Sequence, residues 1–384
     1  MSINRYILNE TSYFGKGARK MIADEIKQRG FQKALVITDQ ALFDVGVTEK
    51  VTKVLEKAGI EFLVYHEVKP NPTVENVQNG VKVCQEYGAD VLVAVGGGSA
   101  IDTAKAIGII MTNPEFSDVV SLNGVANTKN KSLPLIALPT TAGTAAEVTI
   151  NYVITDPEKE VKMVCIDPHD IPILAVIDSE LMESMPKNLA AATGMDALTH
   201  AVEGYITKAA WDMSDMFHLR AIQLIFKYLP DAVNKKDPEA IEKMGLAQYI
   251  AGMGFSNVGL GIVHSMAHQL GAVYDTPHGL ANALLLPYVM RYNGAVCSER
   301  FADILEALGV STVGMTKNVI IATFIEKIKA LSASVGITQS LKDVGVKIED
   351  IPMLAKKAMV DPCKPGNPRD PSVEDIIEIF KMAY

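Results

Sequence analysis

Cysteine is scarce in this sequence. Its four cysteines, at positions 84, 165, 297 and 363, lie far apart and form no CxxC pair. That spacing indicates neither a disulfide framework nor a zinc ribbon, and it is typical of proteins in a reducing compartment. The first residues also lack a basic segment followed by an apolar run, so we expect no signal peptide and a cytoplasmic protein.

An excess of positive charge and long apolar runs are absent as well. The formal net charge is -9 and the pI is near 5.4, which disfavours nucleic acid or an anionic membrane as the main partner. Apolar stretches such as residues 281–290 are too short to span a bilayer, and this one contains Pro287. With 48% hydrophobic and 21% charged residues, the composition is that of a globular enzyme.

The N-terminal part of the chain alternates between short runs of branched residues and amphipathic segments such as 48–58 and 74–87. Buried strands are expected at 33–38, 61–65, 90–95 and 133–138. This alternation predicts an α/β domain with a parallel sheet that is covered by helices on both faces.

After Asp178 the strand-like runs give way to helical patterns. Helices are expected at 189–207, 212–229, 238–253 and 319–332. A chain of 384 residues is too long for one ordinary core. We therefore predict an α/β domain over residues 1–182 and an all-helical domain over residues 183–384.

A glycine-rich loop follows the expected strand 90–95 and reads Gly96-Gly-Gly-Ser-Ala-Ile-Asp-Thr-Ala-Lys105. Glycines let the backbone approach a ligand, and a following helix directs its free N–H groups at the loop, which suits a pyrophosphate. The alternative is a tight turn without a ligand, closed by a capping box from Ser99 to Asp102. The loop is not the Rossmann fingerprint, because the third glycine would fall on Ile101, and no Walker GK[ST] follows.

Two further segments favour a dinucleotide. Asp39 ends the expected strand 33–38, where a carboxylate can bind a ribose 2′-OH and repel a 2′-phosphate, so NAD is favoured over NADP. The alternative role of Asp39 is an ordinary helix cap. Residues 139–147 follow another expected strand and offer three threonine hydroxyls and a glycine.

Histidine is concentrated in one place, because His264, His268 and His278 lie within nineteen residues. Asp196 and His200 are four residues apart in an expected helix, so their side chains project from one face, and His264 and His268 repeat that spacing. One carboxylate and several imidazoles from separate segments indicate a divalent-metal site. The alternative for each histidine is a core residue with one hydrogen bond.

The residue types also bear on the kind of metal site. Nitrogen and oxygen ligands without a thiolate suit Fe²⁺, Zn²⁺, Co²⁺ or Mn²⁺. A zinc peptidase is disfavoured, because the general base of its HExxH motif would fall on Ser265.

Taken together, these motifs resemble those of the iron-dependent (group III) alcohol dehydrogenases, and the likeness extends over the whole chain. It rests on Gly96-Gly-Gly-Ser-x-x-Asp-x-x-Lys105, Pro139-Thr-Thr-Ala-Gly-Thr144 and Gly261-x-x-His-x-x-x-His-x-x-Gly-x-x-x-x-x-Pro-His-Gly279. The resemblance implies an NAD(H)-linked oxidoreductase that transfers hydride to a metal-polarised carbonyl, with a dinucleotide-binding first domain, a metal-binding second domain and a homodimeric assembly.

A narrower likeness points to members of this family that reduce lactaldehyde reversibly to 1,2-propanediol. It is carried by the stretches 5–11, 144–155, 167–172 and 248–257. Two alternatives stay open. The substrate could be another short alcohol, such as methanol, butanol or 1,3-propanediol, or the chain could be a lyase that resembles dehydroquinate synthase.

The resemblance also implies roles for individual residues. The metal, Fe²⁺ with Zn²⁺ or another divalent ion as the alternative, would be bound by Asp196, His200, His264 and His278. His268 would be a catalytic residue that relays a proton. Phe255 and Cys363 would lie in the substrate pocket. The NAD(H)-binding residues would be Asp39, Asn71, Gly97, Gly98, Ser99, Thr140, Thr141, Thr144, Thr149, Asn151 and Lys162.

Overall fold

The structure is a computed structural model that describes residues 3–159 and 161–384. The chain divides into two compact units, Met1–Met185 and Pro186–Tyr384, and each is described by itself. The predicted boundary after residue 182 falls shortly before this division.

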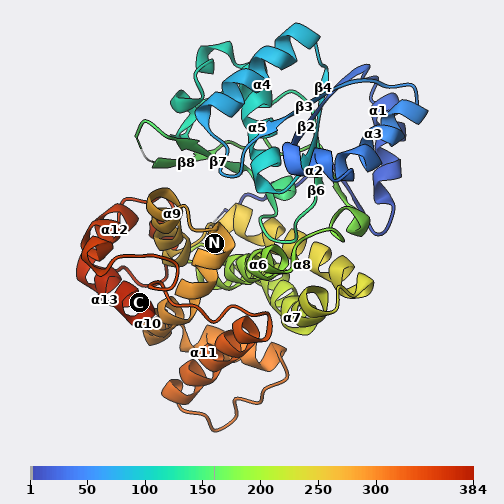
Figure 1. Cartoon of the computed structure of the whole chain (residues 1–384). Helices are drawn as coiled ribbons and strands as arrows, with labels where there is room; N and C mark the ends of the chain where they lie inside the picture. Colours follow the sequence, from blue (N-terminus) through green and yellow to red (C-terminus); the bar gives the residue numbers. More distant parts are fainter. Residues whose placement is uncertain (1–2, 160) are drawn as a thin grey trace. The chain divides into compact units, whose positions relative to one another are not determined.

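A six-stranded sheet forms the centre of the first unit (Figure 1). Its strand order is β1-β9-β6-β4-β2-β3, and every neighbouring pair is parallel, as predicted. The strands are β1 (Thr11–Phe14), β2 (Lys33–Asp39), β3 (Glu61–Val68), β4 (Val91–Gly96), β6 (Leu135–Pro139) and β9 (Leu174–Ile177). The short strands β1 and β9 were not predicted.

Alternate residues of the central strands face two separate hydrophobic cores. Leu35 and Leu92 pack on one face with residues of two helices, and Val36 and Val93 pack on the other face with residues of two more. The first pair is α4 (Val74–Tyr87) and α5 (Gly98–Thr112), and the second pair is α1 (Ile22–Gln28) and α3 (Val47–Lys57). Because both faces are buried, β4 and β6 are apolar throughout, as a parallel sheet between helices requires.

A small second sheet in this unit was not predicted. It has the order β5-β8-β7 and contains an antiparallel pair, β7 (Asn151–Asp156) and β8 (Val161–Ile166), beside the short β5 (Gly124–Val125). Buried and partly exposed residues alternate along β7, the pattern of a strand with one covered face. An expectation based on continuous apolar runs misses such strands.

The capping box from Ser99 to Asp102, which was the alternative interpretation of this loop, does not form. Helix α5 begins at Gly98 and its N-cap is Gly97, with no side-chain cap. The Asp102 carboxylate instead accepts a hydrogen bond from the backbone N–H of Val153 on β7, at 3.0 Å. Burial raises the pKa of Asp102 to about 7. The N–H groups in the first turn of α5 therefore have no side-chain cap and can donate hydrogen bonds to an anion.

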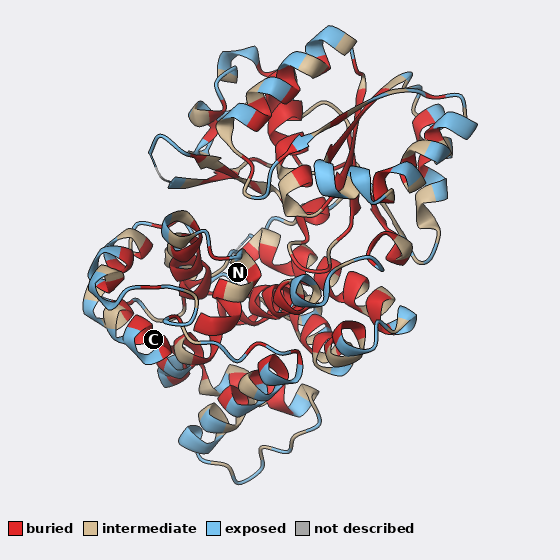
Figure 2. Ribbon diagram, viewed as in Figure 1, coloured by how far each residue is buried: buried red, intermediate tan, exposed pale blue. Residues whose placement is uncertain are grey.

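The second unit is built from helices, and its described residues contain no strand. Helix α6 packs against α7, α8 and α10 and is buried on nearly all sides (Figure 2), so its polar residues are buried as well. The helices are α6 (Lys187–Ile206), α7 (Asp212–Asn234), α8 (Pro238–Val258), α9 (Ile262–Tyr274), α10 (His278–Ala307), α11 (Lys317–Ser334), α12 (Ile351–Ala358) and α13 (Val373–Ala383).

Within the described ranges, no helix is by itself both long and apolar enough to cross a membrane. Only the bent pair α8 and α9, with 103° between its two helices, meets the length and composition test when taken together.

Candidate functional site

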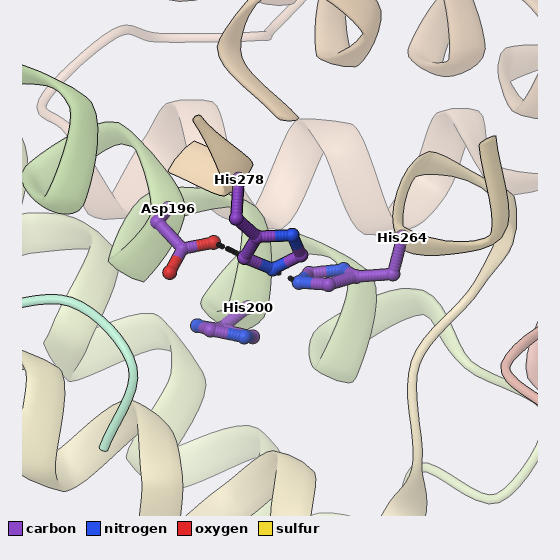
Figure 3. Close-up of side chains that lie close together, drawn as sticks. All are labelled: Asp196, His200, His264 and His278. Atoms are coloured by element: carbon purple, nitrogen blue, oxygen red, sulfur yellow. Dashed lines mark ion pairs between the residues drawn. The ribbon is translucent and has the colours of Figure 1, made fainter. Parts of the chain in front are cut away.

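Four side chains from three helices of the second unit point toward a common centre (Figure 3). Asp196 and His200 lie on α6, His264 lies in the first turn of α9, and His278 is the first residue of α10. Their four candidate ligand atoms lie within 4.8 Å of one another. Asp196 Oδ1 is 3.8 Å from His264 Nε2 and 3.5 Å from His278 Nε2. The structure therefore brings together all four residues that were predicted to bind metal.

Glycines in the histidine motif let the three helices approach closely. A Cβ at Gly279 would lie 2.3 Å from the carbonyl oxygen of Ala192 and 3.2 Å from Cβ of Asp196. A Cβ at Gly261 would lie 2.8 Å from the carboxylate of Glu203. A larger residue at position 279 would push α10 away from α6, and one at position 261 would displace the Glu203 side chain.

The electrostatics of the cluster fit a divalent cation. Burial lowers the pKa of His264, and the neighbouring His200, His278 and His268 lower it further, so the His264 imidazole is neutral and has a lone pair to offer. The His200 ring stacks on His264 and on Phe255, with centroids 4.5 and 4.2 Å apart. One carboxylate and three imidazoles form a donor set that Fe²⁺ or Zn²⁺ accepts.

Two residues that the sequence analysis did not single out contact this cluster. Glu203 Oε2 lies 2.6 Å from His264 Nδ1. Asn282 Nδ2 donates a hydrogen bond to Asp196 Oδ1 at 2.7 Å and lies 3.1 Å from His264 Nε2. Burial raises the pKa of Glu203 to about 8, against the opposing effect of backbone N–H groups at the start of α9. The sequence could have indicated Glu203 as part of the site, because its spacing places it on the same helical face as Asp196 and His200.

His268 lies beside the four residues but its Nδ1 faces a different carboxylate. Nδ1 of His268 is 2.9 Å from Asp361 Oδ2, and its ring stacks on His278 with centroids 5.4 Å apart. Asp361 Oδ1 accepts the backbone N–H of Cys363 at 2.9 Å. Burial acts to raise the pKa of Asp361, but His268 and the hydrogen bonds to Cys363 outweigh it and lower the pKa. Asp361 thus holds the His268 ring in one orientation.

In the first unit, several predicted cofactor residues lie at the carboxyl ends of β4 and β6. The backbone N–H of Thr140 donates to the carbonyl of Gly96 at 2.9 Å. A Cβ at Gly97 would lie 3.2 Å from Thr141, and a Cβ at Gly98 would lie 3.0 Å from Thr144. The threonine side chains therefore pack directly against the glycine backbone, beside the N-terminus of α5, whose free N–H groups favour an anion.

Asp39 plays the capping role that was its alternative assignment. Its Oδ1 accepts a hydrogen bond from the backbone N–H of Leu42 at 2.9 Å. Asp39 is thus the N-cap of the short helix α2 (Gln40–Asp44). The cap uses one carboxylate oxygen, so the other can still accept a hydrogen bond from a ribose hydroxyl. Two other predicted cofactor residues contact each other, because Lys162 Nζ donates to Asn71 Oδ1 at 2.8 Å.

Lys105, part of the glycine-rich motif but given no role from the sequence, is completely buried. Its ammonium group donates to the carbonyl oxygens of Thr149 and Asn151 at 2.5 and 2.9 Å. The Asp170 carboxylate lies 3.9 Å from the ammonium group. Lys105 therefore ties α5 to the segment that carries two of the predicted NAD(H) residues.

Another buried histidine, His218 on α7, occupies a space left by two glycines. A Cβ at Gly204 or Gly254 would lie 2.3 or 2.2 Å from its Nε2. Neither ring nitrogen has a hydrogen-bond partner within the part of the chain that the structure describes. Burial lowers the pKa of His218 from 6.5 to about 3.

We expect His218 to make the fold sensitive to acid. Because its folded-state pKa is depressed, the unfolded chain binds the proton more tightly, and the stability contributed by neutral His218 is complete only above pH 6.5. Below that value the free energy of unfolding should fall by about 1.4 kcal/mol per pH unit. The test measures the free energy of unfolding by denaturant for the wild type and His218→Gln from about pH 7.5 to 5. The difference between the two proteins gives the pH dependence that His218 contributes. A difference between the two proteins that stays constant over this range contradicts the prediction.

Comparison with known proteins identifies the family. One family model, described as iron-containing alcohol dehydrogenase, matches residues 9–179, and a second, described as the C-terminal part of the Fe-containing alcohol dehydrogenase family, matches residues 190–384. The chain belongs to the iron-containing alcohol dehydrogenase family. The resemblance seen in the sequence motifs is confirmed, and the chain is an oxidoreductase. Membership of this family implies NAD(H) and Fe²⁺ as cofactors and small alcohols or aldehydes as substrates.

Individual relatives match over the full length. Lactaldehyde reductase of Escherichia coli (strain K12) is 55% identical over 381 residues, which are 99% of this chain and 100% of the relative. NAD-dependent methanol dehydrogenase of Bacillus methanolicus is 41% identical over 99% of this chain and 100% of the relative. A solved 1,3-propanediol oxidoreductase superposes with a TM-score of 0.96 at 41% identity and covers 100% of both chains. These names span several short substrates, so the family alone does not select one.

Proposed function

We propose that this protein reduces lactaldehyde reversibly to 1,2-propanediol with NADH, using Fe²⁺ bound by Asp196, His200, His264 and His278. The observation that carries the proposal is the buried cluster of these four side chains, whose ligand atoms lie within 4.8 Å of one another. The choice of lactaldehyde is supported by the 55% identity to a lactaldehyde reductase over 381 residues. By likeness to the family, the proposal also includes a homodimeric assembly and a cytoplasmic location.

In this proposal the four residues supply one negative charge and three neutral nitrogen ligands. A divalent cation held by them would polarise the carbonyl oxygen of the aldehyde and stabilise the alkoxide that develops there. NADH supplies the hydride. His268 relays the proton to the product oxygen, because Asp361 holds its Nδ1 at 2.9 Å and leaves Nε2 for the transfer.

The cofactor would be held by groups of the first unit. Backbone N–H groups of Gly97, Gly98 and Ser99 at the start of α5 would bind the pyrophosphate, and Asp39 would bind the adenosine ribose. The remaining residues would line the path of the dinucleotide. They are Asn71, Thr140, Thr141, Thr144, Thr149, Asn151 and Lys162.

Asp39→Ser should shift the cofactor preference from NADH toward NADPH. Serine can keep the helix cap, because its hydroxyl accepts the same backbone N–H, but it removes the charge that repels a 2′-phosphate. We expect kcat/KM for NADPH to rise about 10-fold or more, which corresponds to about 1.4 kcal/mol. Steady-state kinetics with both cofactors measure the ratio. An unchanged ratio in the folded variant would rule out contact between Asp39 and the ribose.

A panel of short aldehydes tests the substrate. We expect kcat/KM with NADH to be at least about 10-fold higher for lactaldehyde than for formaldehyde, butanal or 3-hydroxypropanal, the aldehydes that correspond to the alternative alcohols. A higher value for one of the others would replace lactaldehyde as the substrate and leave the metal chemistry intact. If no aldehyde consumes NADH, the proposed reaction is wrong.

A further inference from the structure

Glu203 continues the face of α6 that carries Asp196 and His200. The three residues are spaced four and three apart, so their side chains project along one side of the helix. Glu203 is only 1% exposed. The carboxylate reaches across to α9, where Oε1 accepts the backbone N–H of Val263 at 2.7 Å and Oε2 lies 2.6 Å from His264 Nδ1. One side chain thus contacts both the first turn of α9 and the imidazole that this turn presents.

Both contacts of Glu203 suit a carboxylate. Burial raises its pKa to about 8, and the backbone N–H groups at the start of α9, together with the charge of a bound cation, favour the ionised form. The backbone N–H of Val263 can only donate, and a carboxylate can accept from it and from Nδ1–H of His264 at the same time. An anion at the start of α9 is also favoured by the helix dipole. Gly261 makes the approach possible, since any Cβ there would lie 2.8 Å from Glu203 Oε1.

The Glu203 contact decides which nitrogen of His264 faces the cluster. A proton on Nδ1 that is donated to Glu203 leaves the Nε2 lone pair directed toward Asp196 Oδ1, which is 3.8 Å away. A proton on Nε2 would prevent that nitrogen from binding a cation. Carboxylates that accept from the second nitrogen of a ligating histidine are a general means of fixing its tautomer and raising its basicity.

We propose that Glu203 is a positioning residue of the metal centre, which fixes the tautomer and orientation of His264 and thereby sets the affinity for a divalent cation. The inference rests on the proposed ligand set. It adds a second buried carboxylate to the site, one that touches a ligand and not the cation.

Cobalt binding by Glu203→Gln tests this role. The amide has one acceptor for two donors, so its N–H₂ group must face either Nδ1–H or the N–H of Val263. We expect the dissociation constant for Co²⁺, measured by competition with a chelating dye, to rise about 10- to 100-fold. The rise in melting temperature on adding Co²⁺ should shrink accordingly. NADH binding, followed by its fluorescence, should not change.

Asn367→Ala is the matched control. Asn367 Oδ1 accepts the N–H of Ile262 at 3.3 Å, so it also holds the start of α9, but no hydrogen bond joins it to His264. We expect this variant to melt earlier while its Co²⁺ affinity stays within about threefold of the wild type. If Glu203→Gln behaves in the same way, Glu203 is a helix cap and the inference is wrong. If the wild-type protein itself binds no Co²⁺, the proposed ligand set fails instead.

A measurement on the wild type covers the case in which Glu203→Gln does not fold. Histidines labelled with ¹⁵N in the metal-free protein report which ring nitrogen carries the proton before any cation binds. We expect a buried histidine, absent from the spectrum of His264→Gln, with its proton on Nδ1. A proton on Nε2 of that ring would overturn the proposal.

Discussion

Replacing Asp196 with asparagine should lower kcat/KM for aldehyde reduction by about 10³-fold or more, equivalent to about 4 kcal/mol of transition-state stabilisation. Asparagine has nearly the same shape, and its amide oxygen can still accept the hydrogen bond from Asn282, which is 2.7 Å long in the native protein. The charge is lost, and Asp196 is the one carboxylate in the four-residue cluster. Steady-state kinetics and metal analysis after reconstitution with Fe²⁺ measure the effect.

Asp303→Asn serves as the control for the Asp196 variant. Asp303 accepts a hydrogen bond from the hydroxyl of Tyr205 at 3.0 Å and is not a member of the cluster. We expect this variant to keep its metal and to lose less than about threefold in kcat/KM. An Asp196→Asn protein that retains both metal and activity would show that the cation is bound elsewhere.

The second large effect is expected for Asp361→Asn. The backbone N–H of Cys363, 2.9 Å from Oδ1, holds the amide oxygen in place, so the amide N–H₂ group turns toward His268 Nδ1. That nitrogen must then accept, so the ring can no longer carry protons on both nitrogens, which is the form in which Nε2 donates a proton to the product oxygen. We expect kcat to fall about 10²- to 10³-fold, with metal content and the KM for aldehyde nearly unchanged.

The double variant of Asp361→Asn with His268→Gln distinguishes this role from a structural one. If Asp361 acts through His268, the double variant should be no slower than His268→Gln alone, because the two residues work as a unit. Additive losses would indicate that Asp361 supports the fold of the segment around Cys363 and does not orient the relay.

The sequence predicted features that depend on local spacing. The parallel strands were predicted from their apolar runs. Two residue pairs were predicted from the spacing of an α-helix, namely Asp196 with His200 and His264 with His268. The contacts that were missed join distant positions. Glu203 and His264 are 61 residues apart, and His268 and Asp361 are 93 apart, so no local period reveals them.

The alternative interpretation of Ser99 and Asp102 as a capping box failed for the same physical reason. The two residues have the spacing of a capping box, but the Asp102 carboxylate is bound by Val153, which lies 51 residues away on β7. β7 and β8 themselves escaped prediction because β7 has only one covered face and little apolar continuity. A tertiary contact outweighed the local signal in both cases.

Metal removal and return, followed by NADH absorbance with lactaldehyde, tests the central claim most directly. We expect chelation to abolish NADH oxidation, and Fe²⁺ or Zn²⁺ to restore it in the wild type and not in Asp196→Asn, because the cation supplies the charge that stabilises the developing alkoxide. Full activity in the chelated, metal-free protein would contradict the account.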